Sequence, residues 1–416
     1  MARVSRCLSR AAACPLAAWL AAVPAGAQTV LHVGPGQPFA QIQQAAAVAA
    51  PGDAIEVAAG FYQPFALTVG ATVRAVYGAI VIVQPTAPGT TTTRFAIPAG
   101  QRARICGLIF FNPSSASTQP SQFVLVDAGE GVVSFENCQM AGYGGVAALT
   151  VFRGNVTLRW CQLVHGANAL FARFSRVAAV QCTFQSDDAA QLNSVTNMAI
   201  SLDNSQLQMS GLCIVTGGSG SPVFPFAANG SALALVGASD AWLEGSNFTG
   251  GNVSTGSPAP GAVGIRNDGT GFVRHRRCAI AGGTGSSAFG QAPAITGQAQ
   301  AVPVLGIGMS PSAGLVLGTS YSVMVAAEPQ APTILVATLG LNAPVQDPLL
   351  AGWHWGLAPQ AIVFTNFTIG DAAGHTTLAG AVPNSPVLRD IGVWFTALSG
   401  TALPLDVSPP VGGVVR

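Results

Sequence analysis

The chain has 416 residues, of which 8% are charged and 50% are hydrophobic, whereas average soluble domains are about 25% charged. All 17 basic residues are Arg, and the formal net charge is +1. This balance gives no electrostatic basis for binding nucleic acid or an acidic membrane surface. The surface must therefore be built largely from Ser, Thr, Asn, Gln and backbone groups.

The N-terminus predicts an export signal. Arg3, Arg6 and Arg10 precede an apolar run over residues 11–22, and residues 25–27 form an A-x-A cleavage site. The run is too short to span a bilayer, which needs about 20 apolar residues. We expect residues 1–27 to be removed, and the mature protein to be secreted or held at the cell surface without a transmembrane segment.

The mature chain begins with a short strand-like run and then an Ala-rich segment, residues 42–50, with helix propensity. Its apolar side carries Ile42, Ala45, Ala46 and Ala49, and residues 51–52 (Pro-Gly) end it. An amphipathic helix here would cover the first coil of a solenoid, whose end otherwise exposes core and unpaired strand edge.

A solenoid is predicted by a pattern, close to Cys-x-apolar-x-Gly, that recurs after short apolar runs at steps of 32, 23, 21, 31, 33 and 32 residues. Its first position is occupied in turn by Cys106, Cys138, Cys161, Cys182, Cys213, Ser246 and Cys278. Side chains at equivalent positions of stacked coils point the same way, so we expect free thiols that act as small core fillers rather than disulfides.

Just before each Cys position, the period-two alternation of apolar residues shifts by one. A straight strand cannot shift in this way and keep one face inward, so a corner between two strands is predicted there. The predicted corner residues are Asn137, Trp160, Gln181, Gly245 and Arg277. The outward positions near the corners are then Glu136, Gln139, Arg159, Gln162, Thr183, Gln185 and Asn247.

The opening of the mature chain resembles that of right-handed parallel β-helix proteins of the pectin-lyase-like superfamily. The resemblance lies in residues 33–45 (VGPGQPFAQIQQA), 50–57 (APGDAIEV) and 60–62 (GFY), and it extends to about residue 300. It implies an all-β fold: a right-handed parallel β-helix over residues 28–300 with a short N-terminal capping helix.

The period stops near residue 300. Residues 301–416 carry longer strand-like runs separated by Pro and Gly turns, at residues 321–327, 333–339, 361–369, 375–382, 391–398 and 411–415. We expect a small antiparallel β-sandwich. Its last part is similar to C-terminal modules of secreted bacterial repeat proteins.

The resemblance also implies which residues to test for catalysis. Lyases of the superfamily combine Ca²⁺-binding carboxylates with an Arg or Lys base, and its glycosidases use a paired Asp-Asp with a His-Gly and an Arg-x-Lys. This chain has Asp187 and Asp188, but its His-Gly, at His165, precedes them, and Lys is absent. The pair is therefore a candidate catalytic pair or, more simply, a polar turn.

Other candidates have two interpretations each. Asp187, Asp188 and Asp203 could bind Ca²⁺ if they lie on adjacent coils, although Asp203 also fits a turn. His275 has inward parity, which favours a partly buried structural His over a ligand or base.

The remaining candidates would bind a glycan. Arg274, Arg276 and Arg277 suit an acidic glycan or a solvated strand face, and Trp353 and Trp355 suit sugar stacking or the core of the sandwich. The sequence favours an exported scaffold or binding protein, with polysaccharide or cell-surface components as partners and no recognisable catalytic or metal site. The alternative is a divergent polysaccharide lyase or glycoside hydrolase.

Overall fold

The computed structural model describes most of the chain from residue 28 onward. The described residues are 28–85, 92–112, 122–127, 131–142, 147–186, 198–219, 230–253, 260–286, 290–301, 306–310, 315–327, 332–339, 344–346, 353–355, 362–369, 375–386, 391–399, 406–407 and 411–415. The predicted export signal therefore lies outside the described residues, and it stays a prediction. Within the described residues, no helix has the length and apolar character needed to cross a membrane.

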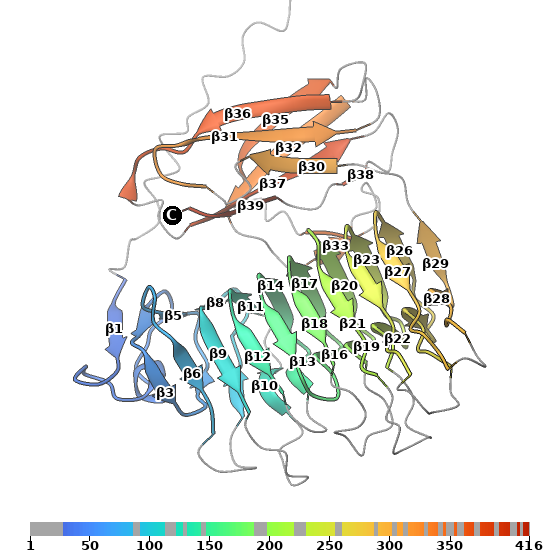
Figure 1. Cartoon of the computed structure of the whole chain (residues 1–416). Coiled ribbons are helices and arrows are strands. Elements are labelled where there is room, and N and C mark those ends of the chain that lie inside the picture. Colours follow the sequence, from blue (N-terminus) through green and yellow to red (C-terminus); the bar gives the residue numbers. More distant parts are fainter. Residues whose placement is uncertain are drawn as a thin grey trace, which may run out of the picture.

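Residues 30–301 form a right-handed parallel β-helix of three long sheets, in which each strand pairs with the equivalent strands of the coils before and after it (Figure 1). Sheet A has eleven strands: β1 (Val30–Val33), β2 (Ala54–Val57), β5 (Thr72–Ala75), β8 (Arg102–Cys106), β11 (Val132–Glu136), β14 (Asn155–Arg159), β17 (Arg176–Val180), β20 (Gln206–Ser210), β23 (Asp240–Glu244), β26 (Val273–Arg276) and β29 (Ala299–Ala301).

Sheets B and C have nine strands each. Sheet B contains β3 (Gly60–Tyr62), β6 (Val81–Val83), β9 (Leu108–Phe111), β12 (Gln139–Ala141), β15 (Gln162–Val164), β18 (Thr183–Gln185), β21 (Ile214–Thr216), β24 (Asn247–Thr249) and β27 (Ala279–Ala281). Sheet C contains β4 (Ala66–Leu67), β7 (Thr93–Phe95), β10 (Gln122–Asp127), β13 (Ala147–Phe152), β16 (Leu170–Arg173), β19 (Ile200–Asp203), β22 (Leu233–Val236), β25 (Ile265–Asn267) and β28 (Ile295–Thr296).

The predicted corners join sheet A to sheet B. Residues in the left-handed backbone region turn the chain there, with φ of 51° at Asn137, 52° at Trp160, Gln181 and Arg277, and 57° at Gly245. A second set of left-handed corners joins sheet C to sheet A, at Arg153, Phe174, Asn204 and Gly237. Each coil is therefore bent at two fixed points, and the apolar side chains of all three sheets point into one core.

The core is one continuous cluster along the β-helix. It contains all nine residues for which the sequence predicts burial in a single core: Val133, Phe135, Cys138, Met140, Leu158, Cys161, Leu163, Cys182 and Phe184. Phe95 and Phe135 meet edge to face with ring centroids 5.3 Å apart, which is a favourable geometry for aromatic pairs. The six cysteines after residue 27 are free thiols, as predicted.

One Cys assignment is wrong. Cys106 pairs with Glu136 in sheet A, and both precede their corners, so Cys106 points outward and is half-exposed. The inward position after the corner at Gly107 is taken by Leu108, which is fully buried. The error arose because Cys-Gly-Leu resembles the repeated pattern but places the Cys two residues before the position that Cys138 occupies in its own coil.

The predicted helix is α2 (Ile42–Ala46), five residues long. Ile42, Ala45 and Ala46 are buried in the core of the β-helix, and α2 lies against β1, β2 and β4. Gln41 and Gln44 form a capping box at its N-terminus. The helix therefore closes the first coil, as the sequence predicts.

The described residues from 306 onward form the C-terminal module, made of antiparallel sheets. One sheet contains β30 (Gly306–Ser310), β31 (Ser320–Ala326) and β36 (His375–Ala381), and a second contains β35 (Ile362–Ile369), β32 (Pro332–Leu339), β37 (Gly392–Ser399), β38 (Asp406–Val407) and β39 (Val411–Val414). The hairpin β33 (Pro344–Gln346) and β34 (Trp353–Trp355) is separate. Val323 of β31, Leu335 of β32 and Phe395 of β37 share one core, as a small sandwich requires.

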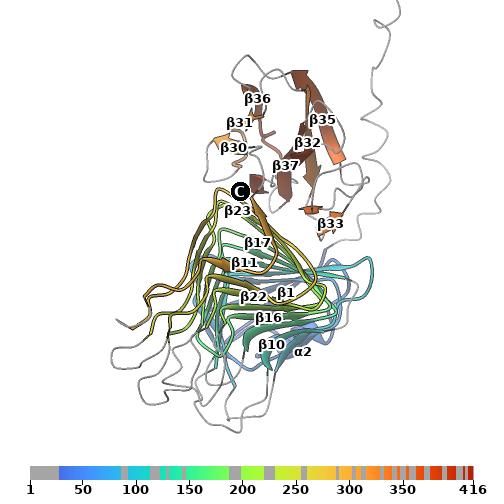
Figure 2. The same cartoon turned by 90° about the vertical axis from the view of Figure 1, so that its right-hand side faces the viewer.

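The C-terminal module lies over the outer face of sheet A (Figure 2). Trp394 packs on Ala178 and Val180 of β17, and β33 lies close to β17 and β20. The predicted boundary at residues 300/301 lies within β29, one residue before the last strand of the β-helix ends. The division of the chain into two domains at this boundary stays a prediction.

Candidate functional site

Six carboxylates on or beside the β-helix strands are paired with arginines, whereas the carboxylate of Asp240, on β23, accepts a hydrogen bond from the Phe272 amide at 2.8 Å. Among the described residues, these ion pairs join Glu56 to Arg74 (2.7 Å), Asp127 to Arg94, Glu136 to Arg104 (2.8 Å), Asp203 to Arg173 (2.9 Å), Glu244 to Arg276 (2.7 Å) and Asp268 to Arg266 (2.9 Å). Most of them join neighbouring coils, as strand stacking dictates. Their first role is to hold adjacent coils together.

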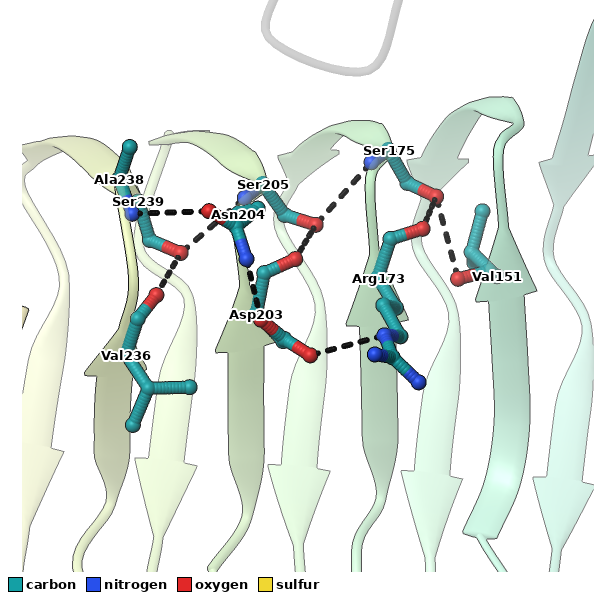
Figure 3. Close-up of polar contacts among 9 residues, drawn as sticks. All are labelled: Val151, Arg173, Ser175, Asp203, Asn204, Ser205, Val236, Ala238 and Ser239. Carbon is teal, nitrogen blue, oxygen red and sulfur yellow. Dashed lines mark hydrogen bonds and ion pairs between the residues drawn. The ribbon is translucent and has the colours of Figure 1, made fainter.

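Asp203 lies in the most connected polar corner, between sheets C and A (Figure 3). Nε of Arg173 contacts Oδ2 of Asp203 at 2.9 Å, and Nδ2 of Asn204 donates to Oδ1 of Asp203 at 2.6 Å. The Ala238 amide of the next coil donates to Oδ1 of Asn204 at 3.1 Å. Asn204 is suited to this corner because Asn tolerates left-handed backbone better than most residues.

A ladder of buried serines runs along the same corner. The backbone amide of Ser175 donates to the Ser205 hydroxyl at 3.0 Å, and the amide of Ser205 donates to the Ser239 hydroxyl at 3.1 Å. Each of these hydroxyls donates in turn to a carbonyl of its own coil (Figure 3). The ladder satisfies backbone amides that the bend removes from sheet pairing.

Aromatic and basic side chains flank this corner on its outer side. Phe152 and Phe174 meet edge to face with centroids 6.4 Å apart, and Phe174 is 46% exposed. The Arg153 and Arg173 guanidinium groups each lie 5.2 Å from the centroid of one of these rings. Such stacking holds the guanidinium groups in place at the surface.

The carboxylates of this outer row are too far apart for glycoside hydrolysis. Asp127, Phe152, Arg173 and Asp203 occupy equivalent positions on four consecutive strands of sheet C. Three strand spacings separate Asp127 from Asp203, which is about 14 Å. Paired catalytic carboxylates lie roughly 5–9.5 Å apart.

The predicted catalytic pair, Asp187 and Asp188, lies outside the described residues. Of the predicted calcium ligands, only Asp203 is described, and Arg173 and Asn204 occupy its carboxylate. In the described part of the chain, no group of three or more His, Cys, Asp or Glu side chains is arranged to hold a metal ion. The calcium site therefore stays a prediction that depends on residues 187–188.

The three candidate arginines are separated by the fold. Arg276 is 3% exposed and bound to Glu244, so it neither lies on a solvated strand face nor is available to an acidic glycan, the two interpretations that the sequence offers for it. Arg274 is half-buried, and Arg277 is an exposed corner residue. His275 points inward and is half-buried, and burial lowers its pKa, as expected for a structural His.

Burial also raises the pKa of Glu244, the partner of Arg276, because the carboxylate is removed from water. Trp353 and Trp355 lie on β34, of which the structure describes only the backbone.

The outer faces of sheets A and B differ sharply in exposure. On sheet A, outward residues of the central strands are buried: Arg159, Ala178, Gln208, Ser210, Trp242 and Glu244. Arg159 illustrates the cause, because its guanidinium lies between the rings of Trp160 (3.6 Å) and Trp394 (4.7 Å) of the C-terminal module. The sequence predicts Arg159 as outward, but it gives no signal that another domain covers it.

On sheet B, the predicted outward residues do reach solvent. Gln162, Gln185 and Asn247 are exposed, and Gln139 and Thr183 are half-exposed. Sheet B is therefore the face on which the predicted neutral amides and hydroxyls meet water.

The fold and these faces define the chain as a right-handed parallel β-helix protein with an antiparallel C-terminal module. No protein-family model matches the sequence, and a search of curated proteins finds no similar sequence.

Among solved structures, the chain is similar to the pectate lyase Pel9A, at 10% identity over 67% of this chain and 79% of that one, with a TM-score of 0.36. It is also similar to an alginate lyase from Paenibacillus sp. str. FPU-7, at 11% identity over 62% and 95% of the two chains, with a TM-score of 0.31. A third structure is tailspike protein 2 of Escherichia coli O157:H7 bacteriophage CAB120, at 12% identity over 90% and 61%, with a TM-score of 0.25. Likeness at this level carries no argument about activity.

Proposed function

We propose that this protein is an exported β-helix that binds carbohydrate and has no catalytic activity of its own. The observation that carries the proposal is the pairing of six carboxylates on or beside the β-helix strands with arginines, while Asp240 accepts a backbone amide. Each of the six named above is held by an Arg, and the two on the outer row of sheet C are about 14 Å apart. General acid–base chemistry needs a free acid and a base within reach of one bond.

Binding needs less than catalysis. Exposed amides, hydroxyls, stacked arginines and aromatic rings supply hydrogen bonds and apolar contact to sugar hydroxyls and ring faces without any proton transfer. Repeated coils present such groups at regular intervals along a surface long enough for a polymer. Export follows from the signal predicted in residues 1–27 and gives the protein access to extracellular or cell-surface polysaccharide.

The test is a panel of neutral and uronic-acid polysaccharides, incubated with the mature protein in the presence and absence of Ca²⁺. Ultraviolet absorbance detects the unsaturated products of a lyase, a reducing-end assay detects hydrolysis, and gel retardation detects binding. We expect retardation by at least one polysaccharide and no turnover of any. Turnover that disappears in an Asp187→Ala, Asp188→Ala double variant would overturn the proposal and identify the catalytic pair.

A further inference from the structure

The strands of sheet B carry no charged residue. Sheets A and C hold all twelve residues of the Arg–carboxylate pairs on or beside their strands, whereas the sheet B strands contain only apolar residues, amides, hydroxyls and glycine. We call the outward side of these nine strands the sheet B face. It is made of Phe61, Ile82, Ile109, Phe111, Gln139, Ala141, Gln162, Val164, Thr183, Gln185, Ile214, Thr216, Asn247, Thr249, Ala279 and Ala281.

Hydrogen-bonding groups are regular on this face. Five consecutive strands, from β12 to β24, each present at least one outward amide or hydroxyl. The side chains of Gln139, Gln162, Gln185 and Asn247 make no hydrogen bond within the described part of the chain, so their donors and acceptors are available. Because strands stack at about 4.8 Å, these groups recur at nearly the interval by which one sugar ring lengthens an extended chain.

The N-terminal end of the face is apolar and exposed. Phe61 is 67% exposed and Ile80, beside β6, is 64% exposed, and the nearby turn presents a fully exposed Tyr77. Phe111 of β9 is 40% exposed. Aromatic rings in such positions offer an apolar surface against which the carbon-bound hydrogens of a sugar ring can pack.

We infer that the sheet B face binds an uncharged polysaccharide in an extended conformation, running along the axis of the β-helix. The inference rests on the proposed carbohydrate binding and adds the face and the class of glycan. Eight strand spacings make the face about 38 Å long, enough for several sugar rings. An acidic glycan would gain little here, because its recognition depends on Arg or Lys, and the arginines lie on the other two sheets.

The experiment measures retardation of the mature protein in native gels containing a soluble uncharged β-1,4-glucan (hydroxyethyl cellulose) or the acidic polymer polygalacturonate. The test variant is the Gln162→Ala, Gln185→Ala, Asn247→Ala triple substitution. The matched control is Gln300→Ala, because Gln300 is an exposed Gln on the outer row of sheet A. All three test residues are exposed, so the triple variant should fold, which its thermal unfolding midpoint verifies.

We expect the uncharged glucan to retard the parent and Gln300→Ala equally, and to bind the triple variant at least tenfold more weakly. Stronger binding to polygalacturonate, or unchanged glucan binding by the triple variant, would overturn the inference while leaving carbohydrate binding in place. Failure of every polysaccharide to bind would overturn the proposed function as well. Dimerisation of the parent that the triple variant abolishes would instead assign the face to a second copy of the chain.

Discussion

Sheets A and B come from the same coils and differ in what lies outside them. The outward side of sheet A holds ion pairs and large polar side chains, and the C-terminal module buries its centre through Trp394. The outward side of sheet B is uncharged, and most of its residues reach solvent, although Ala141 and Val164 are buried. The core of a β-helix does not constrain its outward side chains, so its faces can differ in role. Here the outer side of sheet A is an internal interface, and we propose that the outer side of sheet B binds a ligand.

The largest effect should come from breaking the ion pair on the covered face. Glu244→Ala leaves the Arg276 guanidinium buried without its carboxylate, and we expect the free energy of unfolding to fall by about 3–5 kcal/mol. Urea unfolding measures this loss in the free energy of unfolding. The matched control is Glu136→Ala, whose partner Arg104 is more exposed, with an expected loss of about 1 kcal/mol or less. Equal losses in the two variants would mean that the centre of sheet A is not covered.

A substitution of Trp394 tests whether the C-terminal module packs on sheet A. Trp394→Ala removes a 7% exposed ring from Ala178, Val180 and the Arg159 guanidinium, and we expect a loss of about 3 kcal/mol. The thermal transition should also split into two, because the module no longer packs on the β-helix through Trp394 and the two parts unfold separately. Phe367→Ala, at a 65% exposed position of the module, should change neither the free energy of unfolding nor the shape of the thermal transition. An unaltered transition in Trp394→Ala would argue against the docking of the module on sheet A.

The two corners that border sheet A allow a finer comparison. Ser205→Ala leaves the buried Ser175 amide without an acceptor, and we expect a loss of about 1–3 kcal/mol. Cys182→Ala leaves the Cys161 amide without its sulfur acceptor at 3.4 Å. Sulfur is the weaker acceptor, so this loss should be smaller. Unfolding in urea ranks the two variants, and the reverse order would show that the thiols matter more for packing than we infer.

The smallest effect concerns pH. Burial lowers the pKa of His275 below its ordinary 6.5, so the unfolded chain binds the proton more readily than the folded one. Stability from this group is complete above pH 6.5 and is lost as the pH falls below that value. The contribution of His275 to stability is isolated by comparing the unfolding midpoints of the parent and His275→Gln between pH 7.5 and 5. A parent that loses no more stability than the variant on acidification would contradict this assignment.

The sequence predicts the β-helix and its corners because both leave a periodic trace. The parity shift before each Cys position identifies corner residues such as Trp160 and Gln181, which have left-handed backbone in the structure. The serine ladder could not be predicted from the sequence. Ser is common in turns, so Ser175 and Ser205 carry no distinctive signal. The thiols also do more than fill space, since Cys161 and Cys182 donate to carbonyls of their own coils just as the serines do.

The covered face could not be predicted. The Arg159 guanidinium packs on Trp394 of a module more than a hundred residues further along the chain, and nothing near Arg159 in sequence marks that contact. The neutral outward residues of the open face, by contrast, follow directly from strand parity. Local alternation sets which way a side chain points, whereas long-range docking sets whether it meets water.

Hydroxyl-radical footprinting with and without the uncharged β-1,4-glucan tests most directly whether the open face binds ligand. Phe61, Tyr77 and Ile214 are exposed, reactive side chains on or beside the sheet B face, and Phe174 and Phe272 are similarly exposed elsewhere on the β-helix. We predict that the glucan protects the first three from oxidation and leaves the other two unchanged. Protection of Phe174 with continued oxidation of Phe61 and Ile214 would contradict the account and move the binding site to the corner of Arg173 and Asp203.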